Sequence, residues 1–201
     1  MNNQNHNPHE VNLLDMRREL DQAQDAGGEG NAPLPLAKVG SNPVPLVMFD
    51  YRAVSVPVHH LKSAQYRGFL RCSGTGCILC AAQYGRWTKV VFPVYNPLTI
   101  RVELLAVDDQ RDPGSALAQI LEILGNDPAE MVLLLMRQVN FNFAIMEKKM
   151  PSSMRPDQQV IDHFKAERER GLDLASIYPQ MDNEQLMNVP EIAMLLELGN
   201  E

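Results

Sequence analysis

The three cysteines of the chain all lie within nine residues, in the stretch CSGTGCILC that runs from Cys72 to Cys80. A disulfide would leave one thiol over. A Gly-rich loop with C-x4-C-x2-C spacing is more typical of a metal site than of cysteines buried for packing. The fold has to bring these thiols to one point, so the stretch constrains the chain more than any other feature does.

Two kinds of metal centre use related spacings. The plant-type ferredoxin pattern requires a distant fourth cysteine, and no cysteine follows Cys80. Zinc accepts imidazole nitrogen as well as thiolate, and His59 and His60 lie upstream. A zinc deaminase would need H-x-E and P-C-x-x-C, which these residues lack. We therefore expect a closed, structural zinc site of Cys72, Cys77, Cys80 and one histidine, and the residues alone do not choose between His59 and His60.

Charge is unevenly distributed along the chain, whose net charge is −7 at pH 7. Residues 51–105 hold seven Lys and Arg side chains and a single acidic one, Glu103. Residues 1–50 and 106–201 are acidic overall. A basic centre between acidic ends is typical of a nucleic-acid-binding core with appendages.

Alternating apolar residues predict strands in the centre of the chain. In 84–95, Val90, Phe92 and Val94 share one face. A short helix is expected at 115–125, with Ser115 as its N-cap and Gly125 beyond its end. About five strands with a helix before the last predict a small barrel of the OB type. The stretches that carry these strands are 44–60, 84–95, 99–107 and 131–146.

The two ends of the chain read as extensions of the core. Residues 1–43 are expected to form a flexible arm with one short helix at 10–26. Residues 151–201 read as a helical, acidic tail, and its last part, 171–201, has six acidic side chains and no basic one. The apolar patch 192–196 predicts either a protein-docking segment or a packed C-terminal helix.

The N-terminal sequence lacks an apolar core segment, and the chain has no run of eighteen apolar residues. We therefore expect a cytoplasmic protein with no membrane segment.

Aromatic side chains interleave with cations around the cysteine stretch. Rings that stack on unpaired bases, beside cations that follow the phosphates, are typical of single-stranded nucleic-acid sites. For Trp87, burial in the core is an equally good interpretation. The candidate nucleic-acid-binding residues are Tyr66, Arg67, Tyr84, Arg86, Trp87, Lys89, Tyr95 and Arg101.

The segment HHLKSAQYRGFLRCSGTGCILCAAQY, residues 59–84, resembles the zinc-containing single-stranded DNA-binding proteins of T-even-type bacteriophages. The separation of His59 from Cys72 and the C-x2-C of Cys77 and Cys80 match that family, and the resemblance extends over roughly residues 48–146. It implies an OB-fold core, a zinc ion bound by His59 and the three cysteines, and an acidic tail that recruits replication and recombination proteins in the host cytoplasm. Two features depart from the family: the loop between Cys72 and Cys77 is shorter, and the N-terminal arm is acidic rather than basic.

We therefore expect a mainly β protein whose OB-fold-like five-stranded barrel, residues 44–150, carries a zinc-bearing insertion. Its expected role is non-enzymatic: it binds and protects single-stranded DNA during replication, recombination or repair. DNA and RNA are not distinguished by these residues. The alternatives are an iron–sulfur or CxxC redox protein and a zinc-knuckle protein-interaction module that binds no nucleic acid.

Overall fold

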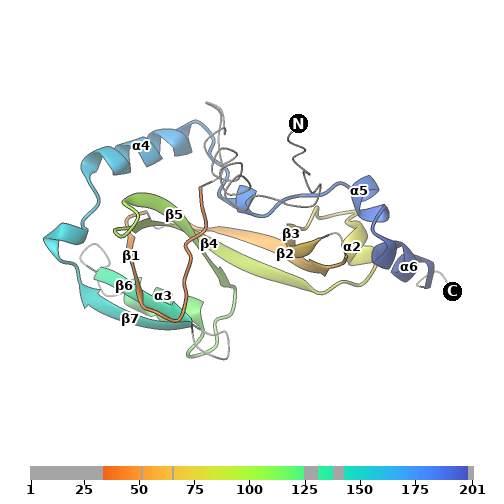
Figure 1. Cartoon of the computed structure of the whole chain (residues 1–201), viewed down its shortest axis with the longest axis horizontal. Helices are drawn as coiled ribbons and strands as arrows, with labels where there is room; N and C mark the ends of the chain where they lie inside the picture. The colour runs from red at the N-terminus through yellow and green to blue at the C-terminus, as the bar shows by residue number, and fades with distance from the viewer. Residues whose placement is uncertain (1–33, 51, 65, 125–130, 138–142, 199–201) are drawn as a thin grey trace, which may run out of the picture. The chain divides into compact units, whose positions relative to one another are not determined.

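The computed structural model in Figure 1 describes residues 34–50, 52–64, 66–124, 131–137 and 143–198. The strands are β1 (Val44–Met48), β2 (Val54–Lys62), β3 (Arg67–Arg71), β4 (Arg86–Asn96), β5 (Arg101–Asp108), β6 (Met131–Arg137) and β7 (Phe143–Lys149). The helices are α2 (Ile78–Ala81), α3 (Ala116–Leu124), η2 (Ser152–Met154), α4 (Gln158–Glu169), η3 (Leu174–Ile177), α5 (Asn183–Met187) and α6 (Pro190–Leu198). The helix expected at 10–26 and the glycine at 125 lie outside the described residues.

The seven strands form one antiparallel sheet in the order β3-β2-β4-β1-β6-β7, with β5 paired to β4. The expectation of a mainly β fold is confirmed. The expected barrel is not, because no pairing joins β5 to β7 in the part of the chain that the structure describes, and the sheet stays open. Helix α3 contacts both of these strands. Its N-cap is as predicted, since the Ser115 hydroxyl oxygen accepts a hydrogen bond from the Ala118 N–H at 3.2 Å.

The five-strand prediction was too low because two apolar stretches each contain two strands, and because β3 lies in none of the predicted stretches. Stretch 44–60 divides into β1 and β2, and between these strands the Asp50 carboxylate accepts a hydrogen bond from the Arg52 N–H at 3.0 Å. Stretch 131–146 divides into β6 and β7, which pair from Met131↔Lys149 to Arg137↔Phe143. The alternation predicted for 139–145 falls largely outside the described residues.

Strand β4 organises the packing, because it is eleven residues long and changes partners along its length. Its first half, Arg86–Val91, pairs with β2, and Val94 and Tyr95 pair with β1. The β2–β3 hairpin and the first half of β4 therefore extend away from the other strands, and we call this part, together with α2, the finger (Figure 1).

Both faces of β4 are buried over much of the strand. Val90, Phe92 and Val94 share one face, as predicted, and pack in a cluster that includes Ile120 of α3. On the other face Val91 packs in a second cluster. Burial of one large aliphatic side chain contributes about 1.5–3 kcal/mol, so these clusters account for much of the core's stability.

The folded unit begins earlier than the sequence indicated. Leu36 forms a parallel bridge with Leu104 of β5, and the Ala37 N–H donates to the Leu104 carbonyl at 2.9 Å. Residues 34–43, which we assigned to the arm, therefore belong with the core.

The C-terminal segment packs on the sheet and on the finger. Phe164 of α4 and Leu174 of η3 are buried against the second face of β4, and Ile192 of α6 is fully buried. Of the two interpretations of 192–196, packing is therefore the one observed for Ile192, whereas Met194 and Leu195 stay exposed. In Figure 1, α5 lies beside α2 at the end of the finger. No described helix has the length and apolar character needed to cross a membrane.

Candidate metal centre

Strand alternation on β2 separates the two histidines. His59 is fully buried on the face that carries Leu61. His60 points to the opposite face of the strand, where its ring meets Phe69 edge to face with centroids 5.0 Å apart. The register of the sheet therefore places His59, and not His60, on the buried face, which settles which histidine lies with the cysteines.

The loop from Cys72 to Cys77 is a tight turn that needs its glycines. Gly74 and Gly76 both have φ of +79°, a conformation that L side chains rarely adopt. The Cys77 N–H donates to the Gly74 carbonyl at 3.1 Å, and the Cys72 N–H donates to Pro57 of β2 at 2.9 Å. These bonds hold the loop against the strand that carries the histidine.

The C-x2-C spacing places two thiols on one turn of helix. Cys77 is the N-cap of α2 and Cys80 is its third residue. Residues three apart on a helix lie on the same side. The turn ends at Gln83, whose φ of 58° redirects the chain into β4.

The four predicted ligands come together in the structure. The ligand atoms of His59, Cys72, Cys77 and Cys80 lie within 4.8 Å of one another. The Cys72 and Cys80 sulfurs are 3.7 Å apart, and the His59 Nε2 atom lies 3.6 Å from the Cys77 sulfur and 3.3 Å from that of Cys80. A tetrahedral zinc with ordinary bond lengths has S···S and S···N edges of about 3.8 and 3.6 Å, so the donor set fits that ion.

The second nitrogen of His59 is also engaged. Its Nδ1 atom lies 3.0 Å from the Gly85 carbonyl oxygen. Since a carbonyl only accepts, Nδ1 carries the proton and the lone pair of Nε2 faces the three thiols. Such a backbone partner is the usual support of a metal-binding histidine.

The thiols have opposite tendencies to ionise. Burial raises the pKa of Cys77, but donors that include the Cys80 backbone N–H and the Ser73 hydroxyl outweigh it and lower this pKa to about 6. Burial and the neighbouring Cys72 and Cys77 raise the pKa of Cys80 to about 11. One thiolate is thus favoured and another beside it is disfavoured. A bound dication would favour the ionised form of Cys80 as well as that of Cys77.

Cross-strand pairing gathers a second set of residues on the side of the finger away from His59. Directly paired residues share a face, and the register pairs His60 with Phe69, Lys62 with Arg67, and Val58 with Trp87. We call this surface the aromatic face, and it comprises His60, Lys62, Arg67, Phe69, Trp87 and Lys89.

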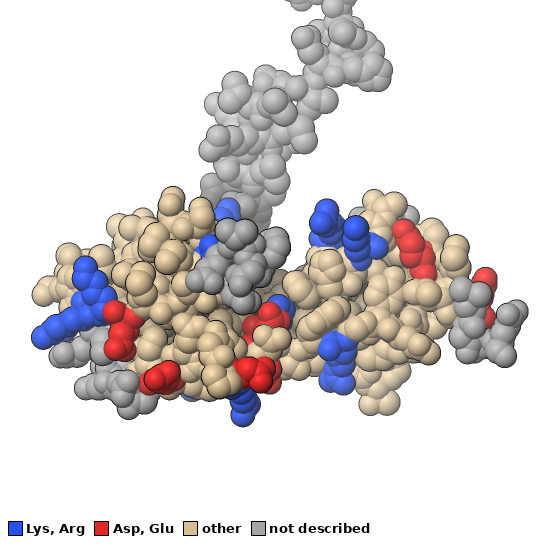
Figure 2. Space-filling model, turned by 90° about the horizontal axis from the view of Figure 1, so that it is seen from below, with Lys and Arg blue, Asp and Glu red and all other residues tan. Residues whose placement is uncertain are grey.

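The aromatic face presents a half-exposed indole. Trp87 is 46% exposed, so the alternative of a core tryptophan is not what the structure has. Its ring meets Phe69 edge to face at 6.4 Å. Lys89 places its Nζ atom 4.5 Å from the Phe69 ring centroid and 2.6 Å from the Asp108 carboxylate. In Figure 2, basic side chains stand together at the upper edge of the right-hand lobe, which holds the finger, α5 and α6.

The C-terminal segment borders the same surface. Tyr178 packs edge-on against Phe69, with ring centroids 6.2 Å apart. Burial and the nearby Asp108 carboxylate raise the pKa of Tyr178 to about 12, so its phenol is neutral at physiological pH. The aromatic face therefore ends at this ring.

The structure brings only three of the predicted nucleic-acid residues, Arg67, Trp87 and Lys89, onto this face. Tyr66 and Tyr84 pack against the metal-site cluster instead, and Arg86 pairs in register with His59.

The other two candidates lie away from the face. Tyr95 is 5% exposed and offers no ring to a base. Arg101 pairs in register with Asn96, at the opposite end of β4 from Trp87, and contacts Glu103. At about 3.3 Å per residue, up to roughly 30 Å of strand separates it from the indole.

Sequence reasoning missed His60, Lys62 and Phe69. The alternation Arg67-Gly68-Phe69-Leu70-Arg71 was the available signal, because period two places Phe69 between two cations on one face.

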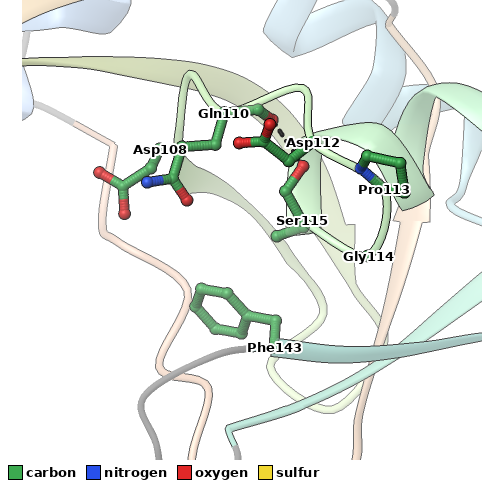
Figure 3. Close-up of a pocket in the computed structure, with 8 residues that line it drawn as sticks. Asp108, Gln110, Asp112, Pro113, Gly114, Ser115 and Phe143 are labelled. Carbon is green, nitrogen blue, oxygen red and sulfur yellow. Dashed lines mark hydrogen bonds between the residues drawn. The ribbon is translucent and has the colours of Figure 1, made fainter.

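A separate pocket of about 270 Å³ lies at the start of α3 (Figure 3). Its charged groups are the carboxylates of Asp108 and Asp112. The Ser115 hydroxyl is occupied, because it donates to the Gln110 carbonyl at 2.6 Å and caps the helix. The residues that line this pocket are Asp108, Gln110, Asp112, Pro113, Gly114, Ser115, Ala116 and Phe143.

No protein-family model, curated protein or solved structure matches the chain. The function is therefore inferred from the geometry of the candidate metal centre and of the aromatic face.

Proposed function

We propose that this protein binds single-stranded nucleic acid on the aromatic face, with a structural Zn²⁺ held by His59, Cys72, Cys77 and Cys80. The observation that carries the proposal is the half-exposed Trp87 beside Phe69 on a face that also holds cations. Unpaired bases stack on such rings with little sequence preference, at about 1–3 kcal/mol per base.

The cations of the face have different roles. Lys62 and Arg67 are exposed and pair in register at the outer edge of the finger, where phosphates can reach them. Lys89 is already neutralised by Asp108, and its place over Phe69 positions that ring. We expect the exposed pair to carry most of the salt-dependent binding.

The metal centre supports this face from the opposite side of the same strand. His59 and His60 are consecutive on β2, the first buried among the thiols and the second beside Phe69. With three thiolates and one imidazole, the centre has no open position for a substrate, so its role is to hold β2, β3 and α2 together. Loss of the metal therefore disturbs the aromatic face without any direct contact.

Action on single-stranded DNA in replication, recombination or repair, as in the phage proteins that residues 59–84 resemble, is part of this proposal. The exposed Met194 and Leu195 of α6, between Glu191 and Glu197, are the surface we assign to partner proteins.

The test uses Trp87, which is the single tryptophan of the chain. Its fluorescence should be quenched on titration with a single-stranded oligonucleotide, and the logarithm of the binding constant should fall linearly with the logarithm of salt concentration. Duplex DNA and single-stranded RNA serve as comparison ligands.

Anisotropy of a labelled oligonucleotide gives an independent measure of affinity for variants. We expect Trp87→Ala to weaken binding by about 1–3 kcal/mol. The control is Leu98→Ala, which changes an exposed apolar side chain in the β4–β5 turn. Unchanged affinity in a Trp87→Ala protein with a normal melting curve would remove the aromatic face as the binding site.

A further inference from the structure

We propose that Asn183 and the helices α5 and α6 complete the metal centre, so that retention of the metal and docking of residues 182–198 depend on one another. The inference rests on the proposed zinc and concerns a different part of the chain. Asn183 is a positioning residue here: it touches the backbone on both sides of a ligand and not the metal position itself.

The Asn183 side-chain amide forms hydrogen bonds with the backbone on both sides of Cys77. Its Nδ2 atom donates to the Gly76 carbonyl at 3.0 Å, and its Oδ1 atom accepts from the Ile78 N–H at 3.4 Å. Gly76 and Ile78 are the two neighbours of Cys77 in the chain. One side chain from more than a hundred residues away thus fixes the backbone that aims the Cys77 sulfur.

The position of Asn183 is fixed by a capping box at the start of α5. The Asp182 carboxylate accepts from the Gln185 N–H at 2.7 Å, and the Gln185 side chain accepts from the Asp182 N–H at 3.0 Å. This reciprocal pair starts α5 and sets the direction of Asn183, its first residue.

Apolar packing joins the same two parts of the chain. The thiols of Cys72 and Cys77 belong to a cluster that includes Leu186, Val189 and Ile192. The buried apolar side chains that the finger contributes to this cluster are Leu61, Leu70 and Leu79, with Ala82 just after α2 and Ile78 partly buried beside them. Without the C-terminal helices the metal loop would lose one wall of its only core within the described residues.

Polar contacts extend the attachment along the finger. Glu191 of α6 accepts from the Ala64 N–H at 3.3 Å. The Arg71 N–H donates to the Pro179 carbonyl at 2.9 Å, and the Arg71 guanidinium pairs with Asp173 at 2.8 Å. Residues 173–191 are therefore tied to both ends of the β2–β3 hairpin as well as to the metal loop.

The coupling follows from how little of this region can fold by itself. Helix α2 has four residues and α5 has five, far below the length at which an isolated helix is stable in water. Each is held by what it packs on. A ligand that stabilises one side of such a contact stabilises the other, and the effect is equal in both directions.

The first experiment measures metal release from the full-length zinc-loaded protein with a chromogenic chelator. Loss of a supporting residue behind a metal ligand typically costs about 10- to 100-fold in affinity, and we expect Asn183→Ala to accelerate release in that range. Asn183→Asp keeps the acceptor but not the donor and should have an intermediate effect. The matched control is Asn188→Ala, at the exposed C-cap of α5. Equal release rates for the Asn183 and Asn188 variants would overturn the proposal.

The second experiment needs no variant. Hydrogen exchange of the wild-type protein is compared before and after chelation. We expect the amides of α5 and α6 to lose protection while those of β1, β6 and α3 keep theirs. Unchanged exchange in α5 and α6, or equal loss across the whole sheet, would show that no local coupling exists.

Failure of this inference is distinguishable from failure of the proposed zinc site. Metal analysis that finds no zinc, or iron instead, removes the zinc site. Zinc at about one ion per chain, with release and exchange indifferent to Asn183, removes only the coupling.

Discussion

The indole of Trp87 lies across Gly85, so closely that a Cβ atom at Gly85 would stand 2.8 Å from the indole Cη2 atom. The carbonyl oxygen of the same glycine accepts the hydrogen bond of His59 Nδ1. The position at Gly85 where a side chain would stand is covered by the Trp87 indole of the aromatic face. The backbone carbonyl of Gly85 contacts His59 of the metal centre. The two sites are joined at one residue.

A Gly85→Ala substitution separates these two contacts. The added methyl group must displace the Trp87 ring, whereas the carbonyl that supports His59 remains. We expect altered tryptophan fluorescence and weaker oligonucleotide binding, by up to the roughly 1–3 kcal/mol expected for losing one stacked base, with normal zinc content. Gly40→Ala is the control, because a Cβ atom there meets nothing within 4 Å. Unaltered fluorescence and affinity would contradict the expected displacement.

Asp108 limits the positive charge of the aromatic face, since it pairs with Lys89 at 2.6 Å. Asp108→Asn leaves the ammonium without its partner, so binding to single strands should tighten at low salt. The slope of log K against log salt should steepen by up to about 0.7, the value for one further phosphate contact. The neighbouring substitution Asp109→Asn, which affects a pair with Arg111, is the control. A tightening that persists at high salt would show that charge is not its cause.

The consecutive histidines provide a matched pair for the metal centre. His59→Ala removes a ligand and its bond to Gly85, so the protein should lose zinc and melt at a lower temperature, as after chelation. His60→Ala removes only a ring contact with Phe69 and should keep its zinc. Metal analysis and melting curves of both variants decide the assignment. Zinc retained in the first and lost in the second would reverse it.

Glu103 is a buried carboxylate with several donors, and it is 3% exposed. It accepts from the Asn96 amide at 2.9 Å and from the Thr99 hydroxyl at 2.8 Å. Glu103→Ala leaves the buried Asn96 amide without its acceptor, and we expect the free energy of unfolding to fall by about 1–3 kcal/mol.

Two further variants test that cause. Glu103→Gln keeps an acceptor for the Asn96 amide, so its free energy of unfolding should fall less than that of Glu103→Ala. Asp109→Ala, which breaks an exposed pair, should change stability by less than about 0.5 kcal/mol. Denaturant unfolding measures all three, and a Glu103→Ala protein as stable as the wild type would mean that water replaces the carboxylate.

The cysteines of the candidate metal centre could be predicted to lie together because their signal is local. Cys77 and Cys80 are one helical turn apart, and the glycines mark the turn that brings back Cys72. The histidine was harder, since His59 and His60 differ only in which face of β2 they occupy, and that depends on the register with β3 and β4. Only the resemblance, not the residues, favoured His59 in advance.

The aromatic face could be predicted only in part, for a physical reason. Period two tells which residues share a face, but it does not tell what covers that face. Tyr95 and Trp87 have the same parity on β4, yet one is buried and the other is half exposed. The cover comes from distant residues, such as Asp173 on Arg71 and Tyr178 on Phe69, and such contacts leave no local pattern.

Asn183 lies 107 positions after Gly76, whose carbonyl it binds. A ribosome adds about 5–20 residues per second, so the cysteine loop leaves it roughly 5–20 s before the helices that cover it. Throughout that interval the thiols meet the surrounding solution with no α5 or α6 against them. The order of synthesis thus leaves the proposed metal site open at first and closes it afterwards, and an ion captured on the growing chain would be enclosed by residues that are made later.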